Sequence, residues 1–314
     1  MKPNWFWKRF KPSTASFVQE AVAADDYSLF DLLHGYVYAR WPYLYIGIGT
    51  GQHRLSRLAQ PVVRAISWLI PPRRADDTRP TFADTYHGKV VPLDAARQLV
   101  TVGEEVRLTD LEHIIPYAKA RDIVLNHPDH IVVLDCPCRT VRAEPCLPLD
   151  VCLIVGEPFA SLVRDHHPHR SRWITPDEAV DILRAEDERG HVHHAFFKDA
   201  MLGRFYAICN CCDCCCGAMR AQRNGTPMLA SSGYVCRVDA DVCIGCESCV
   251  PFCQFHALSV RDGLSIVDAA ACMGCGVCVS RCPQNALSLL RDPAKGEPLE
   301  IEKLIASAAA SAQE

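Results

Sequence analysis

The sequence predicts an α+β protein with a mainly helical N-terminal region, a cysteine-rich α/β domain and a small C-terminal domain of short strands and helices. Three observations predict this organisation. All 19 cysteines lie between Cys136 and Cys282. Two copies of one cysteine motif occur near the C-terminus. Hydrophobic residues make up 49% of the 314 residues, which is enough for a sizeable core in two or three domains.

The change in cysteine content and the repeated motif divide the chain into four segments. Residues 1–90 form a basic, aromatic-rich region that ends in a linker rich in proline and charge at residues 71–90. Residues 91–230 form the cysteine-rich α/β domain, and residues 231–292 contain the repeated motif. Residues 293–314 form a tail whose end is rich in alanine and serine.

The N-terminal region differs in charge from the rest of the chain. Residues 1–74 contain ten Lys or Arg residues against four Asp or Glu residues, whereas the whole chain has a formal charge of −4. Apolar residues recur at helical spacing between residues 58 and 70. This pattern fits an ordinary core helix, or a helix that lies on an anionic membrane or a membrane subunit. We therefore expect residues 1–74 to make any peripheral membrane or membrane-subunit contact.

The composition also limits the partners and the compartment. The net negative charge argues against nucleic acid as the main partner. The chain has no run of about 18 apolar residues and no recognisable secretory or twin-arginine signal. Nineteen cysteines favour a reducing compartment. The sequence thus predicts a cytoplasmic protein, peripheral at the inner face of the membrane if the N-terminal contact forms.

The middle domain contains several local structure signals. Residues 131–135 read as a buried strand that runs directly into Cys136-Pro137-Cys138. Thr175-Pro176-Asp177-Glu178 predicts a helix start with a capping box, and Gly190 predicts the helix end. Residues 191–197 and 204–208 are expected to form two strands joined near Gly203.

The strongest signal is a twin cysteine motif with a period of 29 residues. The copies read Cys243-x2-Cys246-x2-Cys249-x3-Cys253 and Cys272-x2-Cys275-x2-Cys278-x3-Cys282, followed by Pro283. Three thiolates two residues apart, with a fourth further on, are what a cubane iron–sulfur cluster requires. Structural zinc usually pairs two separated C-x2-C units, and neighbours this close cannot form unstrained disulfides. The motif therefore predicts iron–sulfur binding.

Residues 234–292 resemble the bacterial-type ferredoxin family, which carries two [4Fe-4S] clusters. The resemblance implies crossed ligation, in which each run supplies three ligands to one cluster and its last cysteine to the other. The first cluster would then be bound by Cys243, Cys246, Cys249 and Cys282. The second would be bound by Cys272, Cys275, Cys278 and Cys253. Gln254 departs from the family pattern, which usually has proline there, but this removes no ligand.

Ten further cysteines predict a third metal site. They are Cys136, Cys138, Cys146, Cys152, Cys209, Cys211, Cys212, Cys214, Cys215 and Cys216. Six cysteines within residues 209–216 cannot be explained by packing, because adjacent side chains point in different directions. A third iron–sulfur cluster is our main hypothesis, with ligands from either group or both. Zinc and reactive thiols remain alternatives. Residues 131–216 also resemble a segment found beside ferredoxin domains in anaerobic redox proteins, a likeness that names no reaction.

These motifs predict an iron–sulfur electron-transfer protein or subunit that relays single electrons between redox partner proteins. The alternative is an oxidoreductase whose active metal or thiol centre lies in the Cys136–Cys216 region and receives electrons from the ferredoxin segment. A third interpretation is a scaffold or sensor in which the clusters are structural. No dinucleotide fingerprint or Walker loop is present, so we expect any flavin or nicotinamide to be bound by a partner.

Overall fold

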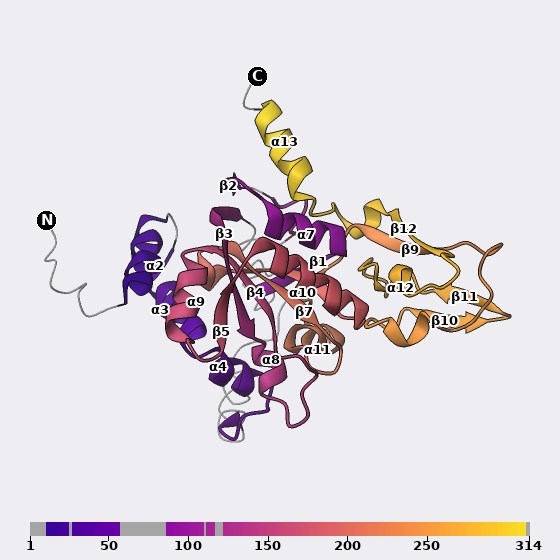
Figure 1. The fold of residues 1–314 in the computed structure, drawn as a ribbon, viewed down its shortest axis with the longest axis horizontal. Helices are drawn as coiled ribbons and strands as arrows, with labels where there is room; N and C mark the ends of the chain where they lie inside the picture. Colours follow the sequence, from indigo (N-terminus) through magenta and orange to yellow (C-terminus); the bar gives the residue numbers. More distant parts are fainter. Residues whose placement is uncertain (1–10, 25–26, 57–85, 110, 117–121, 312–314) are drawn as a thin grey trace, which may run out of the picture.

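A computed structural model describes residues 11–24, 27–56, 86–109, 111–116 and 122–311, and its fold is α+β (Figure 1). A central sheet of eight strands forms the middle domain. Its order is β2 (Val106–Leu108), β3 (Ile123–Asp135), β4 (Asp150–Glu157), β7 (Arg204–Cys211), β6 (Val192–Lys198), β1 (Tyr86–Val91) and β8 (Leu229–Ala230), with β5 (Ser171–Ile174) beside β3. Neighbouring strands run antiparallel, except that β1 and β8 are parallel.

Helices cover both faces of this sheet because the central strands are apolar on both sides. In β3, Ile131 and Val133 belong to one hydrophobic core, while Val132 and Leu134 belong to the other. The first core is covered by α7 (Leu93–Thr101), α10 (Pro176–Glu188) and α13 (Ile301–Ser311). The second is covered by α2 (Pro12–Ala23), α3 (Leu29–Arg40), α4 (Pro42–Gly49), α9 (Phe159–His166) and α11 (Gly217–Arg223). The short helices α8 (Pro137–Thr140) and η1 (Asp199–Met201) follow β3 and β6.

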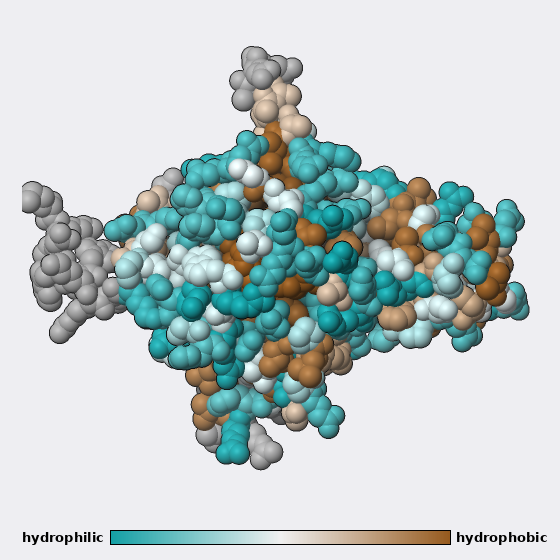
Figure 2. Space-filling model, in the orientation of Figure 1, coloured by the Kyte–Doolittle hydropathy of each residue, from teal (hydrophilic) through white to brown (hydrophobic). Residues whose placement is uncertain are grey.

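The C-terminal domain extends from one side of the middle domain, at the right of Figure 1. It contains two antiparallel strand pairs, β9 (Tyr234–Val238) with β12 (Leu287–Arg291) and β10 (Leu258–Arg261) with β11 (Leu264–Val267). The short helices η2 (Val250–Phe252), α12 (Val277–Ser280) and η3 (Pro293–Lys295) complete it. Figure 2 shows hydrophilic residues over much of the visible face, with hydrophobic residues exposed between them on both the middle domain and this smaller domain.

Most local predictions for the middle domain are confirmed. The predicted strand at residues 131–135 is the second half of β3, and the predicted hairpin is β6–β7. The hydroxyl of Thr175 accepts the backbone N–H of Glu178 at 3.2 Å, as expected for the cap of α10. The capping-box role of Glu178 was wrong, since its carboxylate instead pairs with Arg172 at 2.5 Å. Gly190 ends the helix with a positive φ of 84°.

Two expectations about the N-terminal region have different outcomes. The linker prediction was wrong for residues 86–90, because they form most of β1 between β6 and β8. Charged residues in this stretch favoured a linker in the sequence, because the strand partners lie more than a hundred residues away. The helix expected at residues 58–70 lies outside the described residues, so contact through residues 1–74 stays a prediction. Among the described residues, no helix is both long and apolar enough to span a membrane.

Helix α3 packs closely against η1, the turn that follows β6, at a glycine. A Cβ added to Gly35 in α3 would overlap the carbonyl oxygen of Ala200 in η1. We expect Gly35→Ala to lower the free energy of unfolding by about 1–3 kcal/mol, since overpacking forces the backbone to shift. Gly49→Ala in α4 is the matched control, because nothing lies within 4 Å of its Cβ position. Anaerobic urea denaturation measures both; equal midpoints would contradict this account of the α3 contact.

Candidate metal centres

The eight motif cysteines surround two cavities in the C-terminal domain. One cavity is lined by Cys243, Cys246, Cys249 and Cys282. The other is lined by Cys253, Cys272, Cys275 and Cys278. Each cavity therefore meets three cysteines of one run and the last cysteine of the other run. This grouping fits two cubane clusters with crossed ligation, and the ligand assignment itself stays a prediction.

The 29-residue repeat has a structural reason beyond the cysteines. The backbone N–H of Ala257 donates to Cys253 Sγ at 3.2 Å, and that of Ala286 donates to Cys282 Sγ at 3.2 Å. Both donors lie four residues after the last cysteine of their run. Hydrogen bonds to sulfur stabilise the thiolate and raise the reduction potential of a bound cluster. The sequence Ala-Leu-Ser follows each run at the same spacing, as residues 257–259 and 286–288. Its alanine thus supplies one equivalent donor to each site.

A second pair of equivalent donors includes Cys236, which belongs neither to the twin motif nor to the ten further cysteines. Cys236 on β9 precedes Ser265 on β11 by one repeat of 29 residues. The Cys236 Sγ lies 3.5 Å from Cys278 Sγ, and the Ser265 Oγ lies 3.5 Å from Cys249 Sγ. Once Cys278 and Cys249 are thiolate ligands, Cys236 and Ser265 are the groups that can donate. The repeat period was the signal that could have identified Cys236.

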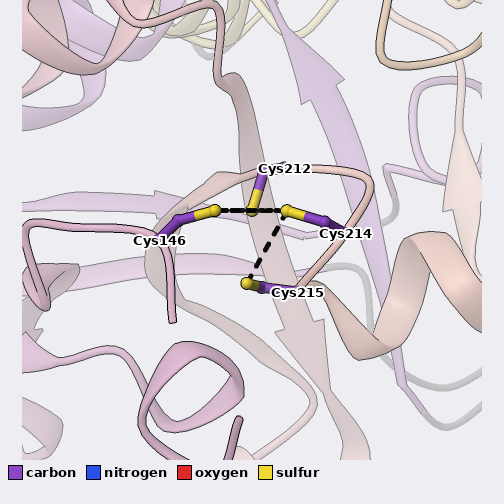
Figure 3. Close-up of side chains that lie close together, drawn as sticks. All are labelled: Cys146, Cys212, Cys214 and Cys215. Atoms are coloured by element: carbon purple, nitrogen blue, oxygen red, sulfur yellow. Dashed lines mark hydrogen bonds between the residues drawn. The ribbon is translucent and has the colours of Figure 1, made fainter. Parts of the chain in front are cut away.

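The ten remaining cysteines form two adjoining groups, and two members of the first group also line the cavity of the second. The first group, the four-thiol site, contains Cys146, Cys212, Cys214 and Cys215, whose sulfurs all lie within 4.8 Å of one another. Cys146 comes from the segment between α8 and β4, and the other three follow β7 (Figure 3). The Sγ–Sγ distances between hydrogen-bonded members are 3.2–3.7 Å. Thiols from both sequence groups are therefore brought together here.

The spacing of the four-thiol site suits a single tetrahedral ion. Bonds of about 2.3 Å to zinc place thiolate sulfurs about 3.8 Å apart. In the described part of the chain, no three of the eight motif cysteines approach one another within 4.8 Å, as befits ligands that surround a larger cluster. Burial raises the pKa of Cys146 to about 11. Burial also acts to raise the pKa of Cys214, but hydrogen bonds from Cys146, Cys212 and Cys215 hold it below its usual value.

The second group, the six-thiol group, lies deeper, at the end of the sheet. Its members are Cys136, Cys138, Cys152, Cys209, Cys211 and Cys216. All six line one cavity, which Cys212 and Cys215 of the four-thiol site also line. Cys152 and Cys209 face each other across β4 and β7 with their sulfurs 3.6 Å apart. Hydrogen bonds from Cys152 and Cys211 hold the pKa of Cys209 well below its usual value. Those from Cys138 and Cys211 do the same for Cys216.

A buried arginine lies between the two groups. Arg139 is 1% exposed and its charge acts on both Cys136 and Cys212. Its guanidinium pairs with Glu186 at 2.5 Å and also donates to the backbone oxygens of Pro148 and Asn210. Burial alone would raise the pKa of Glu186, but hydrogen bonds from His191 and Arg139, with the Arg139 charge, hold it below its usual value. A single buried positive charge with its own carboxylate partner cannot neutralise two groups of thiolates.

The comparison with protein families agrees with the geometry of the C-terminal domain. Residues 242–287 match the family described as the 4Fe-4S dicluster domain. A search among curated proteins finds no match for the chain. The C-terminal segment is therefore an iron–sulfur, ferredoxin-like domain. The family match begins downstream of the four-thiol site and the six-thiol group, so it assigns neither of them.

The side chains of Cys236 and Ser265 should each affect the reduction potential of a cluster bound in one cavity only. A hydroxyl is a stronger hydrogen-bond donor than a thiol. Cys236→Ser should therefore raise the potential of the cluster beside Cys278 by tens of millivolts, and Cys236→Ala should lower it. Ser265→Ala, the matched control, should lower only the potential of the other cluster. Redox titration followed by electron paramagnetic resonance checks this; identical titrations for all three variants would exclude direct hydrogen bonding to the ligands.

Loss of one thiol should release one metal ion from the four-thiol site. We expect Cys146→Ser to lose about one zinc or iron per chain, because three thiolates hold such an ion poorly. Elemental analysis of anaerobically purified protein, with sulfide assay, measures this loss. Leu147→Ser is the matched control, since Leu147 is the exposed neighbour in the same loop. A loss of about four irons with sulfide would instead assign a cubane to these four thiols.

Proposed function

We propose that the protein relays single electrons between redox partner proteins through two [4Fe-4S] clusters in its C-terminal domain. The observation that carries this proposal is the pair of cavities, each lined by three cysteines of one run and one of the other. When bound there, such clusters supply one-electron oxidation and reduction. The residues of the chain hold the clusters, donate hydrogen bonds to the sulfurs and control their exposure to solvent.

The cysteines around the two cavities differ in solvent exposure, and this difference indicates which side of the domain a redox partner can contact. Cys246 beside the first cavity is exposed, while Cys272 and Cys278 beside the second are buried. The neighbouring Val242 and Ile244 are 41% and 63% exposed. Apolar residues around an accessible cluster edge suit a transient redox partner, since a close approach without a large interface is enough. We therefore infer that a redox partner protein contacts the side of the domain that carries Cys246.

The C-terminal domain contacts the middle domain through Gln254, the residue that replaces the usual proline. Gln254 follows Cys253 and accepts the backbone N–H of Asp213 at 2.8 Å. Its amide donates to the backbone oxygen of Gly190 at 2.9 Å. Asp213 lies between Cys212 and Cys214, so one hydrogen bond joins the two cysteine-rich regions. Proline could make neither bond. This junction supports the proposal that electrons pass between the C-terminal and middle domains.

The proposal is tested by reducing the anaerobic full-length protein while its paramagnetic signals are recorded. We expect two one-electron steps, with Cys249→Ser altering one signal and Cys278→Ser the other. Ser259→Ala, on the strand between the motifs, is a control that should leave both steps unchanged. If neither step occurs above about −700 mV, which bounds the known range of such clusters, the clusters are structural and the relay function is excluded.

A further inference from the structure

The thiols of the six-thiol group come from different elements and line one cavity. Cys152 on β4 and Cys209 on β7 lie opposite each other, with their sulfurs 3.6 Å apart. Cys211 lies two residues further along β7, Cys136 and Cys138 follow β3, and Cys216 immediately precedes α11. Only the folded sheet therefore brings these thiols together.

These thiols surround more space than either ferredoxin site. Their cavity measures ≈ 60 Å³, against ≈ 20 Å³ and ≈ 10 Å³ for the two cavities lined by motif cysteines. Cys212 and Cys215 of the four-thiol site line the same cavity, and its remaining wall includes the apolar side chains of Leu134, Ile154 and Phe196. Protein interiors are normally close-packed, so thiols that served only as small hydrophobic residues would leave less space. The size therefore suits an inorganic group larger than one cubane.

The charge balance of the cavity also points to a bound cation. Thiolates buried in an apolar site repel one another and need positive charge. Arg139 lines the cavity, but Glu186 already pairs with its guanidinium. The Nε of Arg139 is buried and has no hydrogen-bond partner among the described residues. A cluster sulfide or thiolate at this wall would accept that hydrogen bond, and metal ions would neutralise the thiolates.

We propose that the six-thiol group holds a polynuclear iron–sulfur cluster larger than a cubane, beside the ion of the four-thiol site, whose Cys212 and Cys215 line the same cavity. A cubane offers one terminal position on each of its four irons, so four thiolates saturate it. Six converging thiolates need more irons, as in two cubane-sized halves that share the cavity. The choice of iron rests on the proposed electron-transfer function, whereas the existence of the site rests on the cavity and its thiols.

The first test is the metal content of the anaerobically purified full-length protein. We expect about sixteen irons per chain, with matching sulfide: about eight in the ferredoxin domain and about eight in the six-thiol cavity. A content of thirteen or fewer overturns the proposal, because that much is explained by three cubanes and one single iron. This outcome is independent of the relay function, which fails only if the ferredoxin clusters do not accept electrons.

The second test locates the additional irons. Cys152→Ala and Cys216→Ala remove thiols from two different elements, β4 and the start of α11, and each should lose about half of the total iron. Ile154→Val is the matched control, since Ile154 lies on the same strand and lines the same cavity without offering a ligand. The ferredoxin resonance signals and the far-ultraviolet circular dichroism must stay unchanged in a folded variant. Full iron retention in either folded cysteine variant overturns ligation by six thiols. If neither variant folds, the wild-type iron content decides together with Cys146→Ser. About sixteen irons support the proposal only when that variant loses one ion, and a loss of about four irons with sulfide overturns it.

Discussion

The register between β4 and β7 is the constraint on which the arrangement of the middle domain depends. It places Cys152 opposite Cys209 and directs both side chains to the face of the sheet that carries α9 and α11. Because side chains alternate along a strand, Cys211 points to the same face as Cys209. A shift of one residue would move these thiols to the other face and replace them with Asn210. The same register brings the loop after β7 beside Cys146, so both thiol groups depend on it.

The junction between the domains explains a departure from the ferredoxin pattern. Proline after the last cysteine of a run would stiffen that turn, and the second run keeps it as Pro283. In the first run the same position faces the middle domain, where backbone groups of Asp213 and Gly190 need partners. Gln254 satisfies both groups, and the nearby His256 pairs with Asp213 at 3.1 Å. The local cost in rigidity is offset by hydrogen bonds that orient one domain against the other.

The two halves of the ferredoxin-like domain are alike in backbone but different in their surroundings. Equivalent alanine N–H groups donate to Cys253 and Cys282, which keeps the two sites similar. The side-chain donors differ, with a thiol from Cys236 on one side and a hydroxyl from Ser265 on the other. The site beside Cys236 is also more buried. With the proposed clusters bound, both differences would favour a lower reduction potential at that site, since weaker donors and burial disfavour the more negative reduced state.

Sequence and structure contribute different parts of this description. The spacing of the twin motif was enough to predict the iron–sulfur domain, because three ligands to a cubane lie within one short loop. The start of α10 at Thr175 could also be predicted from the sequence, since capping acts over three residues. The division of the ten upstream cysteines into groups of four and six could not be predicted from the sequence, because it depends on strand register and on loops that meet in space. The strand at residues 86–90 was missed for the same reason: its hydrogen-bond partners on β6 are remote in sequence. Local spacing therefore determined the chemistry of the C-terminal domain, and only the tertiary structure decided which distant thiols share a site.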